Sequence, residues 1–217
     1  MSRGYLISFE GLDGAGKTTQ LLLLDRWLTE HHVQYVRTRE PGGTAAGVEI
    51  RRLLLERPEL ALHPLAEAFL FQADRAQHFA TVIEPALAAG TLVVTDRCLD
   101  SSIAYQGAGR GLGVELIEQL SLLATQGRVP DLTILLDLDP EHVQLRTNQS
   151  QDESGLRSTP DRFDQEEKAF HVRLRQAFLD LARKYPARIK VIDASQTPEA
   201  MHAEIVQAIV AAGLVSL

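Results

Sequence analysis

The sequence predicts an α/β protein whose parallel sheet is covered by helices on both faces. Short apolar runs recur along the chain, and longer segments with helical periodicity fill the gaps between them. Such strand–helix–strand repeats favour a parallel sheet, because each helix returns the chain to the start of the next strand. At 217 residues and 45% hydrophobic content, the chain can bury one core, so we expect a single domain over residues 1–217.

The expected strands are short and mostly apolar, as strands covered on both faces are. In chain order they are Tyr5–Phe9, Tyr35–Arg39, Leu92–Thr95, Thr133–Leu138 and Lys190–Ile192. Ligands of such sheets lie at the carboxyl ends of the strands. We therefore expect the loops after Phe9, Arg39 and Thr95 to converge on one cleft.

The expected helices carry apolar residues three and four positions apart. They span Thr18–His31, Thr44–Glu56, Pro64–Ala89, Leu116–Gln126, Pro140–Asn148, Gln165–Tyr185 and Pro198–Ala212. Pro85 predicts a kink in the long third helix, because proline donates no backbone hydrogen bond.

Charge and composition exclude several classes of protein. The formal net charge of −7 argues against a non-specific binder of nucleic acid or of anionic membranes. No apolar run reaches the roughly 18 to 20 residues that span a bilayer, and no signal peptide is apparent. The single cysteine, Cys98, excludes an internal disulfide and fits a reducing compartment, so we expect a cytoplasmic protein.

A complete phosphate-binding loop lies between the first strand and the first helix. It reads Gly11, Leu12, Asp13, Gly14, Ala15, Gly16, Lys17 and Thr18, and Thr19 follows it. Its glycines let successive backbone N–H groups point at one anion. Lys17 supplies a charge for the β- and γ-phosphates, and Thr18 supplies a hydroxyl for Mg²⁺. The segment predicts binding of a nucleoside triphosphate and leaves the fate of the γ-phosphate open.

Two acids and an arginine are candidates for chemistry beside this loop. Asp96 ends a buried strand, where it either binds Mg²⁺, usually through water, or caps a helix. Arg97 suits a phosphate clamp, since guanidinium matches phosphate oxygens with two parallel bonds, although a surface ion pair is the alternative. Asp13 lies inside the loop and either positions a phosphate acceptor or closes the turn.

Three further clusters are candidates for substrate contacts. Arg39 begins the Pro-Gly-Gly loop after the second strand, and Arg51 lies on the helix that follows. Phe71 and Arg75 lie one helical turn apart and suit a flat heteroaromatic ring, with core packing and a solvated charge as the alternative. Ser101, Tyr105 and Gln106 follow Asp96-Arg97 at helical spacing and suit a base and sugar, or else helix capping and ordinary packing.

Residues 149–163 are polar and aperiodic and predict a loop between two helices. It is either a surface connection or a lid over the triphosphate, for which Arg157 and Arg162 supply positive charge.

In this order, the motifs resemble those of thymidylate kinase. The matching segments are Phe9–Thr19, Arg39–Thr44, Leu70-Phe71, Asp74-Arg75, Gln77-His78, Asp96-Arg97, Ser101, Ala104–Gly107 and Val191–Ala194. The first motif is common among nucleotide-binding proteins, whereas the ordered set is specific. The resemblance implies the P-loop nucleoside monophosphate kinase fold, with a five-stranded parallel sheet and a short lid. It also implies transfer of the γ-phosphate of ATP to dTMP, with Mg²⁺, by a homodimer.

The resemblance implies roles for the residues of the base pocket. It makes Phe71 the residue that stacks on thymine and Arg75 the donor to a thymine carbonyl. Ser101, Tyr105 and Gln106 then line the pocket for base and sugar.

The resemblance also implies roles around the phosphates. Arg97 clamps the dTMP phosphate with help from Arg51, and Asp13 lies near the sugar and the acceptor phosphate. The phosphate-binding loop has no basic residue between Gly11 and Gly16. This resembles the bacterial type, whose catalytic arginine comes from the lid, as Arg157 or Arg162. Cys98 is a departure, because the family commonly has an aromatic residue there.

The sequence leaves two other interpretations of the function open. The nearest is another P-loop nucleoside monophosphate or deoxynucleoside kinase. The other is a nucleotide-dependent switch, although the guanine-selecting motif Asn-Lys-x-Asp is not present.

Overall fold

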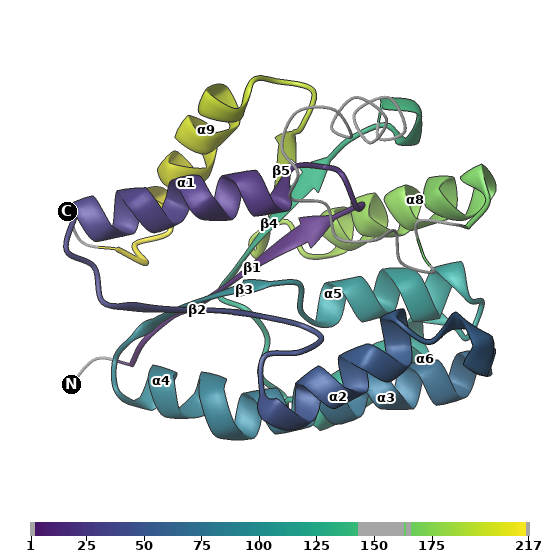
Figure 1. Ribbon diagram of the computed structural model, residues 1–217. Helices are drawn as coiled ribbons and strands as arrows, with labels where there is room; N and C mark the ends of the chain where they lie inside the picture. The colour runs from purple at the N-terminus through teal and green to yellow at the C-terminus, as the bar shows by residue number, and fades with distance from the viewer. Residues whose placement is uncertain (1–2, 143–162, 164–165, 216–217) are drawn as a thin grey trace.

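A five-stranded parallel sheet lies between helical layers in the computed structural model, which describes residues 3–142, 163 and 166–215 (Figure 1). The strands are β1 (Leu6–Gly11), β2 (Tyr35–Arg39), β3 (Leu92–Asp96), β4 (Leu132–Asp137) and β5 (Ile189–Asp193). Their spatial order is β2-β3-β1-β4-β5. The predicted parallel sheet is confirmed, and every strand boundary lies within two residues of the expected one.

The register of the sheet brings three loops to one place. Asp96 at the end of β3 pairs with Phe9 on β1 and with Arg39 on β2. The loops after these three strands therefore leave the sheet at the same level and on neighbouring strands. The expected convergence of the three loops is confirmed.

Helices cover both faces of the sheet. They are α1 (Lys17–Glu30), α2 (Ala45–Leu55), α3 (Pro64–His78), α4 (Glu84–Ala88), α5 (Leu99–Ser102), α6 (Val114–Ala124), α8 (Lys168–Lys184) and α9 (Pro198–Ala211). A 3₁₀ turn, η1 (Pro58–Leu60), and two π-helical segments, η2 (Phe79–Ile83) and η3 (Ile103–Gly109), complete the described elements. No described helix combines the length and the apolar character needed to cross a lipid bilayer.

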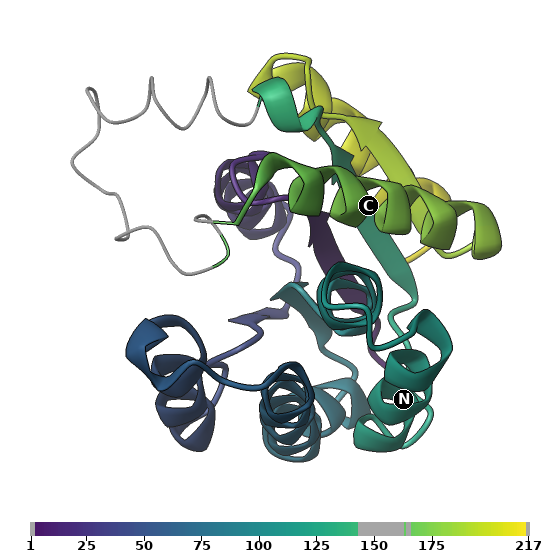
Figure 2. The ribbon, with the colours of Figure 1, turned by 90° about the vertical axis from the view of Figure 1, so that its right-hand side faces the viewer.

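Alternate strand residues separate two cores. Ile7 and Val94 point to the face covered by α1 and α9, whereas Leu6 and Val93 point to the face covered by the other helices. On that second side, α3 contacts both α2 and α6, and Figure 2 shows these helices on the side of the sheet away from α9. The two cores fix the sheet from both sides and so hold the three loops in place.

Two helical segments differ in detail from the expectation. The π-helical segment η2 interrupts the long third helix and ends at Ile83, two residues before Pro85. Proline has no N–H to donate to a preceding carbonyl, which accounts for the interruption. Ser101 and Tyr105, which have helical spacing in the sequence, lie in α5 and in η3. Residues 140–142 begin the expected helix Pro140–Asn148, and its remainder lies outside the described residues.

Candidate active site

The phosphate-binding loop joins the end of β1 to the start of α1. Gly11 has φ of +133°, and a Cβ atom on it would lie 2.5 Å from the carbonyl oxygen of Leu136. Gly16 caps α1 with φ of +101°. Both positions therefore require glycine, and the resulting turn presents the first N–H groups of α1 to an incoming anion.

Lys17 folds its side chain back over this loop. Its Nζ donates to the carbonyl oxygens of Gly11 at 3.1 Å and Leu12 at 2.9 Å. Burial and the neighbouring Arg97 lower the pKa of Lys17, and Asp13, 3.6 Å away, opposes that shift. The ammonium group is thus held at the centre of the loop.

Arg97 follows β3 in a left-handed backbone conformation. Its φ is +68°, which for a residue with a side chain costs on the order of 1–3 kcal/mol. The N–H of Arg97 donates to the carbonyl oxygen of Phe9 at 2.9 Å, and the carbonyl oxygen of Arg97 accepts from the Thr95 hydroxyl at 2.9 Å. These bonds hold a strained residue at the converging loops, which is where strain is commonly functional.

The guanidinium of Arg97 joins the loop after β3 to the phosphate-binding loop. Its donors reach Gly11 O at 3.2 Å, Ser101 Oγ at 2.8 Å, Asp13 Oδ1 at 2.6 Å and Tyr105 Oη at 3.1 Å. Burial would lower the pKa of Arg97, but Asp13 and the other acids nearby raise it well above its usual value. A permanent cation therefore lies against the loop.

Asp13 is a half-buried carboxylate between three partners. Burial alone would raise its pKa, but the charges of Arg97 and Lys17 and hydrogen bonds from Arg97 and Tyr105 outweigh that effect. The pKa of Asp13 is therefore held well below its usual range. The structure thus brings together Lys17, Asp13, Arg97, Ser101 and Tyr105, all five of which the sequence singles out.

The donors available to a metal ion are oxygens at the end of β3 and the start of α1. Asp96 Oδ1 is buried and has no hydrogen-bond partner among the residues that the structure describes, and Thr18 is exposed at the first turn of α1. A buried carboxylate oxygen without a partner is unfavourable unless a cation or water satisfies it. These oxygen ligands fit Mg²⁺, which binds through few protein ligands together with phosphates and water.

Arg39 and Arg51 meet around Gly42 in the loop after β2. A Cβ atom on Gly42 would lie 3.1 Å from Arg51 Cδ and 3.7 Å from Arg39 Nε. Arg51 also donates to the carbonyl oxygen of Pro41 at 3.1 Å, and the Glu40–Pro41 peptide bond is cis. The structure therefore brings together two predicted substrate contacts, of which Arg51 is the one predicted to contact the phosphate.

Phe71 is half-buried on α3 and faces other aromatic rings. Its ring centroid lies 6.4 Å from that of Phe163, which in turn lies 5.3 Å from the Tyr105 ring. Arg110 lies over Phe163 with 5.2 Å between its Cζ and the ring centroid. An aromatic cluster with a cation beside it can hold a planar ring. Stacking of thymine on Phe71 remains a prediction.

Arg75 is more deeply buried than the sequence suggests, since its exposed fraction is 1%. All three of its nitrogens donate to protein acceptors, which are Glu40 Oε2, Gln72 Oε1, Ser102 Oγ, Ser121 Oγ and Cys98 O. This arrangement makes Arg75 a structural cation that joins α3 to the loops after β2 and β3. Its role as a direct donor to thymine remains a prediction.

A buried ionic network surrounds Arg75. Glu40 lies 2.9 Å from Arg75 Nη2 and 3.0 Å from His78 Nδ1. Burial would raise the pKa of Glu40, but Arg75 and His78 lower it on balance. Asp74 Oδ1 accepts from the Gly42 N–H at 3.0 Å, and its Oδ2 is buried without a partner in the described part of the chain. The network holds the loop that carries Arg39 and Pro41.

Gln106 lies away from this centre. Its exposed fraction is 1%, and its Nε2 donates to Glu67 Oε1 at 2.7 Å. It is therefore positioned beside α3 rather than on the phosphate-binding loop. The predicted lid residues Arg157 and Arg162 lie outside the described residues.

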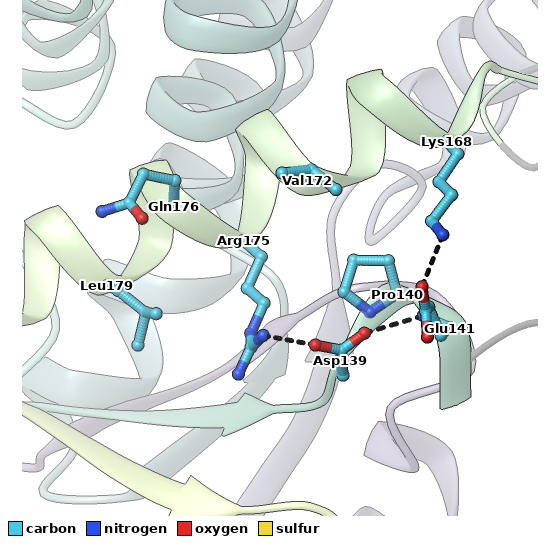
Figure 3. A pocket seen from close by; sticks show the side chains of 8 residues that line it. All are labelled: Asp139, Pro140, Glu141, Lys168, Val172, Arg175, Gln176 and Leu179. Atoms are coloured by element: carbon cyan, nitrogen blue, oxygen red, sulfur yellow. Dashed lines mark hydrogen bonds and ion pairs between the residues drawn. The ribbon is translucent and has the colours of Figure 1, made fainter.

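A separate hollow of about 340 Å³ lies between α8 and the segment after β4 (Figure 3). Arg175 donates to Asp139 at 2.8 Å, and Lys168 donates to Glu141 at 2.6 Å. Its charged side chains are thus paired with one another, and none of the predicted site residues that the structure describes lines it. This hollow is not the candidate active site.

Sequence reasoning missed the acids that organise the site, Glu10 and Glu40. Glu10 ends an apolar strand and is fully buried, and its position beside the phosphate-binding loop is the one available signal. Glu40 lies next to Pro41 in a segment that already reads as a ligand loop. Their partners come from distant segments, which no local pattern reveals.

Known proteins resemble this chain in sequence. The sequence pattern of the thymidylate kinase family matches residues 9–205. A protein named thymidylate kinase from Gloeobacter violaceus is 48% identical over 204 residues, which cover 94% of this chain and 93% of that protein. Another of that name, from Leifsonia xyli, is 50% identical over 202 residues, covering 93% and 92%.

A solved structure gives the same result for the fold. The thymidylate kinase of Ehrlichia chaffeensis has a TM-score of 0.77 and 33% sequence identity, over 95% of this chain and 99% of that one. The nucleoside monophosphate kinase fold expected from the sequence is thereby confirmed. This chain belongs to the thymidylate kinase family.

Proposed function

We propose that this chain transfers the γ-phosphate of ATP to dTMP and so forms dTDP and ADP. The observation that carries the proposal is the contact of Arg97 with Asp13 and Gly11. A cation on the acceptor side is bonded to the loop that cradles the donor phosphates. The geometry suits two phosphates that must meet in line.

In this reaction, an oxygen of the dTMP phosphate attacks the γ-phosphorus of ATP. A bond to that oxygen forms while the bond to the β,γ-bridging oxygen breaks, and the electron pair leaves with ADP. Lys17 and the loop N–H groups stabilise the charge on the donor phosphates. Arg97, Arg39 and Arg51 neutralise and hold the acceptor phosphate.

The remaining substrate contacts are proposed from the residues that surround these two sites. The N–H groups of Gly11, Leu12, Asp13, Gly14, Ala15, Gly16, Lys17, Thr18 and Thr19 bind ATP. Phe71 stacks on thymine, and Asp13 orients the acceptor. Arg75, Ser101, Tyr105 and Gln106 shape the base and sugar pocket.

Thr18 and Asp96 would hold Mg²⁺, which when bound would neutralise charge between the β- and γ-phosphates. The unpartnered Asp96 Oδ1 supports this assignment. Further positive charge for the transferred phosphoryl group is proposed to come from Arg157 or Arg162 in the lid at residues 149–163. A lid cation that arrives after ATP also limits loss of the γ-phosphate to water.

A homodimer is proposed on the apolar side chains that α3 and α6 expose. Phe69 is 53% exposed, Leu116 44% and Leu123 77%, and the two helices contact each other. Large exposed apolar residues on neighbouring helices are typical of an interface. We further propose that residues 1–217 form one domain that works in the cytoplasm, where ATP and dTMP are available and a free cysteine such as Cys98 is stable.

A coupled assay of ADP release across the nucleoside monophosphates tests the proposal. We expect fast ADP formation from ATP with dTMP and little with dCMP, AMP or GMP. Equal or faster turnover with one of the other three would instead assign this site to a different nucleoside monophosphate kinase activity.

A further inference from the structure

We infer that Glu10 is a positioning residue for the acceptor phosphate and that it acts by holding Arg97. The inference rests on the proposed function, in which Arg97 binds the phosphate of dTMP. Glu10 is fully buried and bonds to Cys98 and Ser101, so it acts through these neighbours.

Glu10 bonds to both sides of the segment that carries Arg97. Its Oε1 accepts from the Cys98 N–H at 2.8 Å, and its Oε2 accepts from the Ser101 hydroxyl. Ser101 Oγ in turn accepts from Arg97 Nη1 at 2.8 Å. One carboxylate thus fixes the backbone just after Arg97 and, through one hydroxyl, the end of its side chain.

This support matters because the backbone of Arg97 is strained. A residue at φ of +68° keeps that conformation only when its surroundings over-determine it. The Cys98 N–H that Glu10 accepts belongs to the peptide group that directly follows the strained residue. Loss of this bond would let the peptide rotate and would move the guanidinium away from the loop.

The identity of the residue also argues for a specific role. Glu10 is fully buried in a strand whose preceding residues are mostly apolar, and a buried carboxylate is unfavourable unless hydrogen bonds satisfy it. An apolar residue would fill the same volume without that penalty. Both carboxylate oxygens are used, and both bonds lead to the segment 97–101.

The position of Glu10 in the chain links the two proposed phosphate sites. Glu10 directly precedes Gly11, the first residue of the phosphate-binding loop. The same short segment therefore holds the donor phosphates through the backbone of the loop and the acceptor clamp through the Glu10 side chain. The two phosphate sites keep their spacing because one strand end positions both.

Affinities for dTMP and for thymidine, measured by calorimetry, separate this role from a structural one. Thymidine lacks the phosphate that Arg97 binds, whereas a damaged pocket would weaken both ligands. Glu10→Gln replaces one of the two oxygens by an NH2 group, which donates instead of accepting, so the Cys98 N–H and the Ser101 hydroxyl can no longer each bond to an oxygen of their own. Ser101→Ala is the second variant if Glu10→Gln folds poorly. It removes the bridge together with a hydroxyl of the proposed base and sugar pocket, so its test is whether the affinity for dTMP falls by more than the affinity for thymidine.

Ser8→Ala is the matched control, since Ser8 lies two residues earlier on the same face of β1. Its hydroxyl is equally buried but bonds to Thr133 Oγ1 at 2.8 Å and not to the Arg97 segment. This control should leave both affinities as in the wild type.

We expect Glu10→Gln to lower the affinity for dTMP by about tenfold or more and the affinity for thymidine by less than about twofold. When Arg97 is already replaced by Ala, adding Glu10→Gln should not lower the affinity for dTMP any further, because Glu10 acts by positioning Arg97. Equal weakening of both ligands, or wild-type affinity for dTMP, would overturn the inference. Failure of the proposed function looks different: Arg97→Ala itself would then leave the ratio of the two affinities unchanged.

Discussion

Arg97 Nη2 and Asp13 Oδ1 lie 2.6 Å apart and join two loops that are 84 residues apart in the chain. One loop cradles the donor phosphates and the other carries the proposed clamp for the acceptor. Because the pKa of Asp13 is held well below its usual range, Asp13 is ionised throughout the neutral pH range. The pair is therefore a fixed element of the site rather than a titrating one.

Replacing Asp13 by Asn tests the pair. The variant keeps an acceptor oxygen but loses the charge that orients Arg97 and Lys17, so we expect kcat/KM for dTMP to fall about tenfold or more. Since Asp13 does not titrate near neutrality, the ratio of variant to wild type should stay constant from pH 6 to pH 9. Asp25→Asn, which removes an ion pair between Asp25 on α1 and Arg37 on β2, is the control and should leave kcat/KM nearly unchanged. A ratio that changes steeply with pH would contradict this account of Asp13.

Lys17→Ala should abolish phosphoryl transfer and leave the fold intact. The lysine ammonium is held over the loop by the carbonyl oxygens of Gly11 and Leu12, and removal of a preorganised charge costs about 10²–10³-fold in rate or more. Turnover is measured by ADP release and folding by thermal unfolding. Lys168→Ala, which removes a lysine paired with Glu141 on the surface, should behave as the wild type. Wild-type turnover in Lys17→Ala would refute the role of the loop.

The sequence was sufficient to predict much of this site. The parallel sheet, the convergence of three loops and the grouping of Asp13, Lys17 and Arg97 follow from strand order and from a local motif. The burial of Arg75 and the roles of Glu10 and Glu40 do not. Each of these depends on partners that are 23 to 91 residues away, so only the folded chain brings them together.

Phe71 is a better probe of the base pocket than Arg75. Arg75→Ala would leave Glu40 buried without its main partner, which destabilises a protein by about 3–5 kcal/mol and would obscure any effect on binding. Phe71→Ala removes a half-buried ring, and we expect it to raise the KM for dTMP about tenfold while the KM for ATP stays unchanged. Leu22→Ala, at an apolar position 50% exposed on α1, is the control. Equal changes in both KM values would count against thymine stacking on Phe71.

Leu123→Asp should convert the proposed dimer to monomers. Leu123 is the most exposed of the large apolar residues on α6, at 77%, and a charge there would be buried in an interface formed by α3 and α6. Sedimentation velocity of wild type and variant measures the change. Leu22→Asp, at an apolar position 50% exposed on α1, should leave the oligomeric state unchanged. A wild-type protein that sediments as a monomer would rule out the dimer itself.

Asp74 should make the stability of the protein depend on pH. Burial and the neighbouring Glu40 raise its pKa to about 6, whereas the Gly42 N–H, His78 and Arg75 oppose the shift only in part. The folded state therefore binds the proton more tightly than the unfolded state, whose carboxyl has the ordinary value of 3.8. The resulting stabilisation is complete below that value and is lost as the pH rises through about 6.

Each pH unit between these two pKa values changes the free energy of unfolding by at most about 1.4 kcal/mol. Asp74→Asn keeps an acceptor for the Gly42 N–H but has no proton to lose. The stability of the wild type relative to this variant should therefore fall between pH 5.0 and pH 7.5 in urea unfolding. Asp180→Asn removes an exposed carboxylate on α8 and should show no such trend. If the difference in stability between wild type and Asp74→Asn were the same at both pH values, Asp74 would already be ionised at pH 5.0. A water molecule would then have to donate a hydrogen bond to its Oδ2, which has no partner among the described residues.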